Sequence, residues 1–147
     1  MRISAKGEYA IKAMVDLALH DGRELQPIQD IAARQGIPQR YLEQVLLQLK
    51  RAGFLYARRG SAGGYRLNRP ADTITVGALL RAVEGPAAGP ESARRDSWRA
   101  GEAAAGLAEL WQEIADAVAS VVDHTTLEDL RRRAEERRSA ARPMYHI

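Results

Sequence analysis

Apolar residues recur at every third or fourth position in three stretches near the start of the chain. This spacing puts them on one side of an α-helix and predicts helices over about residues 5–20, 27–36 and 38–53. Ser4 is expected to cap the first helix, and Gly36, which tolerates a left-handed conformation, to end the second. The residues predicted to face the core are Ala10, Ala13, Met14, Leu17, Ala18, Ile28, Ile31, Ala32, Leu42, Val45, Leu46 and Leu49.

The second and third predicted helices are joined by a very short turn. Only Gly36, Ile37 and Pro38 separate them, and proline is well suited to open the next helix. Two helices joined in this way are typical of a helix-turn-helix, whose second helix enters the major groove of DNA. The face of that helix predicted to remain exposed carries Arg40, Glu43, Gln44, Leu47 and Arg51.

A hairpin is predicted directly after the third helix. Residues of strand type at about 54–57 and 65–67 flank the segment 58–64, which holds two arginines and three glycines. We interpret this segment as a wing whose backbone can approach a phosphate. It lacks the Gly-Lys-Ser/Thr ending of a nucleotide-binding loop, so a phosphoryl-transfer function is rejected. A fourth helix is predicted over about 75–83.

The apolar pattern stops over residues 86–101 and returns over 107–122. We interpret the gap as a linker or mobile loop and the returning stripe as a long amphipathic helix. The stripe could belong to the core of one subunit, but a second copy fits better, because DNA-reading helices of this type normally work in symmetric pairs. The residues expected at that dimer interface are Leu107, Leu110, Trp111, Ile114, Val118, Val121 and Val122.

A capping box from Thr125 to Glu128 predicts one more short helix near the end of the chain. The mixed-charge segment 131–138 is expected to be solvated, and the apolar closing segment 144–147 to dock in a groove or to bind a partner. The predicted fold is therefore mainly α, in three parts: a winged helix-turn-helix DNA-binding domain at 1–85, a flexible loop at 86–103, and a dimerisation helix with a C-terminal tail at 104–147.

Charge is distributed unevenly along the chain. The net charge is +3, but residues 1–85 contain 13 Lys and Arg against 8 Asp and Glu, whereas residues 86–147 contain 9 against 11. Between positions 40 and 69 there are seven basic residues and a single acidic one, Glu43. Such a run is often only a solvated surface. Here it coincides with the predicted helix face and wing, which favours a nucleic acid partner.

Composition excludes several other functions. The sequence has no cysteine, which rules out disulfides and Cys-ligated metals, and it has no run of about 20 apolar residues that could cross a membrane. A cytoplasmic protein is the expectation. His20, His124 and His146 lie far apart without metal-ligand spacing. We therefore expect no enzymatic activity, no metal and no cofactor.

The chain is similar to one family of bacterial regulators. The similarity is carried by MRISAKGEYAIKAMVDLA at the start, by IAARQGI and YLEQVLLQLKRAG in the helix-turn-helix, and by ARRGSAGGYRL and ITVGALLRAVEGP after it. These stretches resemble the Rrf-two (Rrf2) family of winged-helix transcriptional regulators of the IscR and CymR types. LWQEIADAVASVVDHTTLEDL and the closing MYHI most resemble the CymR branch of cysteine-metabolism repressors.

The resemblance implies a homodimeric transcription factor. It implies that Glu43 and Gln44 face bases, that Tyr41 lies near the DNA backbone and that Arg59 reaches the minor groove. Side-chain chemistry agrees, because glutamine pairs with adenine at two points, glutamate accepts from cytosine and arginine suits phosphates or a narrow groove. The residues expected to contact DNA are Arg2, Gln39, Arg40, Tyr41, Glu43, Gln44, Arg51, Arg58, Arg59, Gly60, Gly63, Gly64 and Tyr65.

Two departures from the family pattern matter. Iron–sulfur members carry three cysteines in the loop that corresponds to 86–101, and this chain has none, so no [2Fe–2S] cluster is expected. Many relatives have a serine where Pro38 stands, so the hydroxyl cap of the third helix is expected to be lost. The CymR branch acts with O-acetylserine thiol-lyase, a cysteine-synthesis enzyme, as co-repressor, and the resemblance makes that enzyme a candidate partner.

The sequence thus predicts a homodimeric repressor of sulfur- or cysteine-metabolism-type genes that binds a palindromic promoter operator. Two other functions stay open. A small-molecule-responsive regulator of another pathway would hold its effector between the winged domain and the dimer helix. A winged-helix module that mediates only protein contacts would not need an arginine-rich wing, which counts against it.

Overall fold

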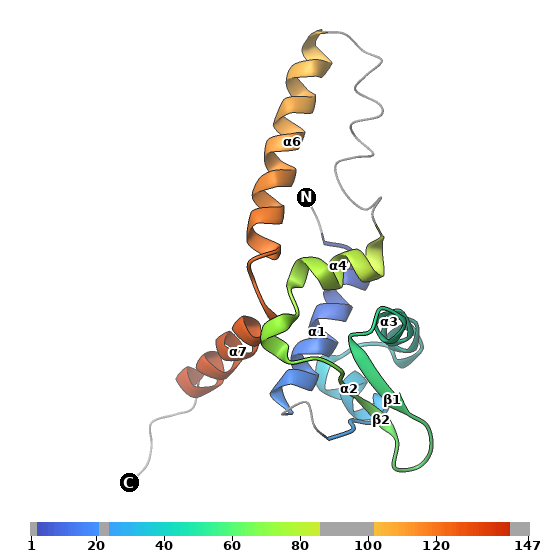
Figure 1. Ribbon diagram of the computed structural model, residues 1–147. Coiled ribbons are helices and arrows are strands. Elements are labelled where there is room, and N and C mark those ends of the chain that lie inside the picture. Colours follow the sequence, from blue (N-terminus) through green and yellow to red (C-terminus); the bar gives the residue numbers. More distant parts are fainter. Residues whose placement is uncertain (1–2, 21–23, 86–101, 142–147) are drawn as a thin grey trace.

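The computed structural model describes residues 3–20, 24–85 and 102–141. Helices dominate these ranges, together with one antiparallel two-stranded sheet, so the predicted mainly α, winged helix-turn-helix fold is confirmed (Figure 1). In chain order the elements are α1 (Ala5–Leu19), α2 (Ile28–Gln35), α3 (Gln39–Arg51), β1 (Leu55–Arg58), β2 (Gly64–Leu67), the 3-10 turn η1 (Ala71–Thr73), α4 (Val76–Glu84), α6 (Glu102–Val122) and α7 (Leu127–Ala141).

Helix ends lie where local chemistry places them. The Ser4 hydroxyl accepts a hydrogen bond from the Gly7 amide at 3.1 Å and caps α1 as predicted. The Thr75 hydroxyl caps α4 in the same way. Gly36 ends α2 with φ at 63°, a left-handed conformation that a residue with a Cβ adopts only with strain. The predicted start of α3 after Pro38 is confirmed.

The core of the winged domain surrounds α1, which packs against α2, α3, α4 and α7. The apolar stripe of α3 meets it, so that α3 is fixed by one face while its other face points to solvent. Full burial of each large apolar side chain contributes about 1.5–3 kcal/mol. The predicted core residues that are buried are Ala10, Ala13, Met14, Leu17, Ala18, Ile31, Ala32, Leu42, Val45, Leu46 and Leu49.

The wing is joined to the helix-turn-helix at its base. β1 and β2 pair antiparallel with Leu55 opposite Leu67. Gln26, just before α2, adds to this pairing, because its backbone exchanges hydrogen bonds of 2.8 and 2.9 Å with Tyr65 of β2. A Cβ on Gly64 would lie 2.4 Å from the Gln26 carbonyl oxygen, so this close approach requires glycine. We call Gln26, Gly64 and Tyr65 the wing root.

α6 leaves the winged domain at one end, and the wing lies at the other (Figure 1). The helix begins at Glu102, so the last two residues of the predicted 86–103 loop are helical, which corrects that boundary. The apolar stripe starts only at Leu107, and alanines, which favour the helix, occupy positions 103–105 before it. Residues 86–101 of the predicted loop lie outside the described part of the chain.

The capping box of α7 lies one residue later than predicted. The Thr126 amide donates to Asp129 Oδ2 at 2.9 Å, and the Asp129 amide donates to Thr126 Oγ1 at 3.1 Å. The predicted pairing of Thr125 with Glu128 is therefore wrong. The Thr125 hydroxyl donates instead to a backbone carbonyl of α6, and Glu128 binds Arg131.

α7 is longer than the short helix predicted and packs against the winged domain. It has 15 residues, contacts α1 and η1, and buries Leu127 completely in the core. Two backbone hydrogen bonds hold its start beside α4, from the Val76 amide to Thr125 at 2.9 Å and from the Leu127 amide to Ile74 at 2.8 Å. The sequence prediction placed residues 104–147 in a separate part of the chain and did not anticipate this packing of α7 against the winged domain.

Candidate nucleic-acid interface

α3 presents polar side chains on the face opposite its buried stripe. Arg40, Glu43, Gln44 and Arg51 are all exposed there, together with Leu47, which is 43% exposed. Because the inner face of α3 is packed in the core, the backbone positions that carry these side chains are fixed relative to the domain. Glutamine and glutamate provide the donor and acceptor groups that read adenine and cytosine in the major groove.

The N-terminal end of α3 suits a phosphate. Pro38 makes no side-chain cap hydrogen bond, as expected from the missing hydroxyl, so the first-turn amides from Gln39 onward have no side-chain acceptor there. Such amides and the helix dipole attract anions. Tyr41 lies beside this end, 37% exposed, with its ring edge-on to that of Tyr9 at a centroid distance of 5.3 Å. The phenol is thereby steadied against α1.

The wing tip exposes two guanidinium groups. Arg58 and Arg59 are exposed, as is Gly60, whose φ of 111° favours glycine. The Gly63 amide is used within the loop, where it donates to the Gly60 carbonyl at 3.0 Å, and a Cβ on Gly63 would lie 2.1 Å from the Arg58 carbonyl oxygen. The close backbone contact in the loop therefore accounts for glycine at position 63, and the contact at the wing root accounts for glycine at position 64.

Tyr65 belongs to β2 of the wing, and its phenol lies near Glu43 of α3. Its side chain is half-buried, and its backbone is paired with Gln26. Burial raises the pKa of the Tyr65 phenol, and the nearby carboxylate of Glu43 raises it further. The phenol therefore stays protonated at neutral pH and lies near Glu43 on the exposed face of α3.

Two further arginines on the basic surface were not among the predicted contacts. Arg66 stacks over the Tyr56 ring at 4.5 Å, and Arg69 stacks over the Phe54 ring at 4.9 Å. Stacking holds the Arg66 guanidinium against β1 and that of Arg69 against the residue before this strand, and both keep their charge. The sequence signal for both was their position at the end of segment 40–69, which holds seven basic residues.

A polar cluster around the buried carboxylate of Asp16 was also missed. Asp16 on α1, 1% exposed, accepts hydrogen bonds from Arg34 Nε at 2.9 Å, from Arg34 Nη2 at 2.8 Å and from Gln35 at 3.0 Å. Arg34 also donates to Gln26 Oε1 at 3.0 Å. The hydrogen bond to Asp16 raises the pKa of the Arg34 guanidinium. We call Asp16, Arg34, Gln35 and Gln26 the α1–α2 clamp. Its sequence signal was an acidic residue within the apolar stripe of α1.

The residues predicted for dimerisation all lie on α6. No side chain of this helix, which is described over its whole length, is buried in the single chain. Leu107, Leu110 and Val121 are 46%, 49% and 64% exposed. Trp111, Ile114, Val118 and Val122 are partly exposed. The predicted DNA contact Arg2 lies outside the described residues.

The described histidines are bound to the backbone of their own helices. Nδ1 of His20 lies 2.7 Å from the Asp16 carbonyl oxygen, and Nδ1 of His124 lies 2.8 Å from that of Ser120. Within the ranges the structure covers, no group of three or more His, Asp or Glu residues could hold a metal ion. No described helix has the length and hydropathy needed to cross a bilayer.

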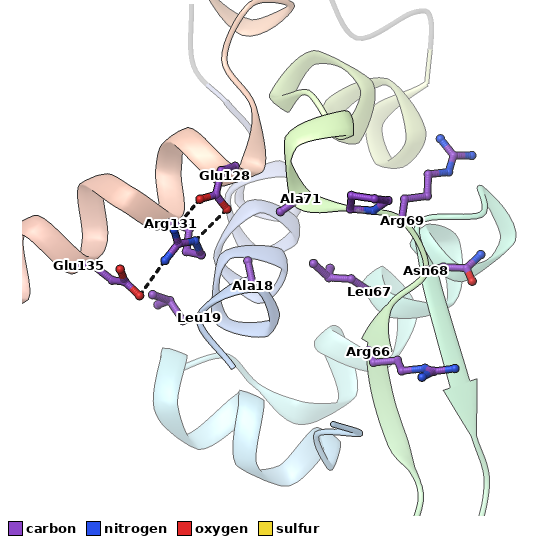
Figure 2. Close-up of a pocket in the computed structure, with 11 residues that line it drawn as sticks. Ala18, Leu19, Arg66, Leu67, Asn68, Arg69, Ala71, Glu128, Arg131 and Glu135 are labelled. Atoms are coloured by element: carbon purple, nitrogen blue, oxygen red, sulfur yellow. Dashed lines mark hydrogen bonds and ion pairs between the residues drawn. The ribbon is translucent and has the colours of Figure 1, made fainter. Parts of the chain in front are cut away.

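A pocket of about 880 Å³ lies between the end of α1, β2 and α7 (Figure 2). Its apolar floor includes Ala18 and Leu67, and Glu128 and Glu135 of α7 form one wall, both bound to Arg131. No residue of α6 lines it, so it is not the pocket between winged domain and dimer helix that a small-molecule regulator was expected to use.

Comparison with known proteins identifies the family. Residues 3–133 match the family model Rrf2, described as an iron-dependent transcriptional regulator. The chain belongs to the Rrf2 family. It is 39% identical over 130 residues to the HTH-type transcriptional regulator CymR of Bacillus subtilis, an alignment that covers 88% of this chain and 89% of CymR. It is 35% identical to IscR of Erwinia tasmaniensis over 88% of this chain and 78% of IscR.

Solved Rrf2-family structures agree with this assignment. The structure of CymR, the global cysteine regulator of B. subtilis, superposes with a TM-score of 0.70 at 36% identity and covers 89% of this chain and 96% of that one. T. potens IscR superposes with a TM-score of 0.77 at 32% identity and covers 99% and 97%. The chain is an IscR- and CymR-like transcriptional regulator, and the expectation of a non-enzymatic protein is confirmed by these relatives.

Proposed function

We propose that this Rrf2-family protein is a homodimeric repressor that binds a palindromic promoter operator in the cytoplasm. The observation that carries the proposal is the pairing of two reading elements on one core. The outer face of α3 exposes Arg40, Glu43 and Gln44, and the wing tip exposes Arg58 and Arg59. A dimer would present two such sets to major grooves about 34–36 Å apart.

Salt dependence of operator binding tests phosphate contact directly. The logarithm of the binding constant should fall linearly with the logarithm of salt concentration, by about 0.9 for each phosphate neutralised. Arg59→Ala should reduce the size of that slope by about 0.9, the value for one phosphate contact. Replacement of Arg133, an exposed arginine on α7, by alanine should leave the slope unchanged. A wild-type affinity that ignores salt would instead favour a module that mediates protein contacts.

The regulated pathway is proposed to be sulfur or cysteine metabolism. The support is 39% identity to CymR over nearly the full length of both proteins and the CymR-like closing segment MYHI. O-acetylserine thiol-lyase is the proposed co-repressor. Calorimetric titration of that enzyme with the full chain, and with a chain lacking residues 142–147, tests the partnership. Genome-wide mapping of bound DNA tests the pathway, because the genes next to the sites identify it.

We infer that regulation does not use an iron–sulfur cluster, although the family is described as iron-dependent. Such clusters are held mainly by cysteine thiolates, and the sequence contains no cysteine. The side chains of this protein therefore do not fit an iron–sulfur cluster. Operator affinity should be the same for protein purified with and without added iron and sulfide.

A small-molecule-responsive regulator is the second candidate, favoured by the pocket between α1, β2 and α7 (Figure 2). That pocket adjoins β2, so a ligand there would contact a strand that continues into the wing. A thermal-shift screen of sulfur metabolites and amino acids tests this function, because a ligand that binds the native state raises the unfolding temperature.

A further inference from the structure

The α1–α2 clamp connects the two elements that carry the candidate DNA contacts. Asp16 holds Arg34 and Gln35 in the last turn of α2, immediately before the turn that leads into α3. Arg34 continues to the Gln26 side chain, and the Gln26 backbone is paired with Tyr65 at the wing root. The single buried carboxylate of Asp16 is thus linked by hydrogen bonds to the last turn of α2, which leads into α3, and through Arg34 to the wing root.

Stability alone explains this arrangement poorly. Removing a carboxylate from water costs several kcal/mol, and apolar side chains of similar volume commonly stabilise a core as well or better. A bidentate arginine–carboxylate pair differs from an apolar contact in fixing direction as well as distance. Gln35 donates to the same carboxylate and Gln26 accepts from Arg34, so three side chains are oriented directly or indirectly by Asp16.

We propose that Asp16 is a positioning residue for DNA recognition, which sets the wing relative to α3 so that Arg59 and Gln44 reach one operator half-site together. It would touch no DNA itself, because its side chain is almost completely buried in the single chain. The inference rests on the proposed operator binding, and it deepens that proposal by naming what aligns the two reading elements.

Amide hydrogen exchange tests the clamp without DNA. In full-length Asp16→Asn, the Gln26 and Tyr65 amides, each of which donates to the carbonyl oxygen of the other residue, should exchange about tenfold faster than in the parent protein. Glu128→Gln is the matched control, because it also breaks a carboxylate–arginine pair, but within α7. It should leave exchange at the wing root unchanged. Unchanged exchange in Asp16→Asn would overturn the clamp.

A double-mutant cycle tests positioning. Asp16→Asn should weaken operator binding about tenfold, and Arg59→Ala should then cost at least about threefold less than it does in the parent chain, because the wing is already misaligned. The cycle of Glu128→Gln with Arg59→Ala should be additive. Additivity of Asp16→Asn with Arg59→Ala would refute the positioning role.

A milder variant keeps the test decisive if Asp16→Asn does not fold. Gln26→Met removes only the link from Arg34 to the wing root and keeps the buried ion pair. It should also speed amide exchange at the wing root and reduce the cost of Arg59→Ala. Exchange and coupling equal to those of the parent chain would overturn the proposal. If Arg59→Ala alone leaves operator affinity unchanged, the proposed DNA contact fails, while the exchange measurement still decides whether the clamp exists.

Discussion

In the proposed operator complex, single residues on the outer face of α3 would divide between affinity and specificity. Arg40 and Arg51 would bind phosphates of any sequence and so stabilise every complex alike. Glu43 is the exception on this basic surface, because a carboxylate near phosphates is repelled unless it accepts a hydrogen bond from a base. Its place next to Gln44, with the half-buried Tyr65 nearby, suits a role in discrimination between operators.

Gln44→Ala should weaken operator binding by about 1–3 kcal/mol and relax the preference at one base position, because a two-point contact to adenine is lost. Fluorescence anisotropy against the operator and its single-base variants measures both effects. Gln112→Ala is the control, because it removes a glutamine of α6 whose side chain donates to Asp116. Equal affinities of the two variants would show that Gln44 is not a base contact.

At the scale of elements, the position of α7 depends on how its start is capped. The reciprocal bonds of Thr126 and Asp129 satisfy two backbone amides at the point where Leu127 enters the core. Because α7 packs against α1, and α1 contacts α2 and α3, disturbance at this cap can reach the recognition helix through packed helices.

Thr126→Ala should lower the free energy of unfolding by about 0.5–2 kcal/mol, the usual cost of losing a helix cap. Thr125→Ala is the neighbouring control and should cost less, because its hydroxyl only adds a bond to an α6 carbonyl that is already at a helix end. Urea unfolding followed by circular dichroism compares them. A larger loss in Thr125→Ala would favour the capping box predicted from the sequence.

The same cap should weaken in acid. Hydrogen bonds from the Thr126 backbone and side chain lower the pKa of Asp129 below its ordinary value of 3.8. A carboxyl with a lowered folded pKa stabilises the protein above its unfolded pKa, and this contribution disappears as the pH falls through the folded pKa. The gap in unfolding temperature between the parent chain and Asp129→Asn should therefore be constant above about pH 5 and narrow below about pH 4. A gap independent of pH would contradict this.

For the whole molecule, the exposed stripe of α6 determines what the protein can bind. One chain leaves Leu107, Leu110 and Val121 open to water along a helix that projects from the winged domain (Figure 1). A second copy that covers this stripe would bury it and at the same time space two α3 helices for a palindrome. Affinity for a full operator then depends on α6, although no α6 residue need touch DNA.

Leu110→Asp should convert a dimer to a monomer of 16.2 kDa, because a carboxylate would be buried at the centre of the interface. Light scattering after gel filtration gives the mass. Operator affinity should fall sharply while affinity for an isolated half-site changes little. Glu113→Gln, an exposed residue of α6 outside the apolar stripe, should keep both properties. A parent chain that is itself monomeric at working concentration would refute the dimer proposal.

The sequence by itself determined the local elements. Apolar spacing located α1, α2, α3 and α4, and Ser4, Gly36 and Thr75 marked their ends, because caps and periodicity act over a few residues. The exposed face of α3 and the arginine-bearing wing followed from the same local patterns, and the family resemblance added the likeness to CymR. These parts required no knowledge of distant contacts.

Only the tertiary structure decided between patterns that are locally equivalent. Thr125 with Glu128 and Thr126 with Asp129 both have capping-box spacing, and the backbone bonds of Thr125 and Leu127 to the start of α4 select the second. The pairing of Asp16 with a residue 18 positions later was hidden for the same reason. Contacts between elements depend on how helices pack in space, and a pattern along one element carries no information about its partner.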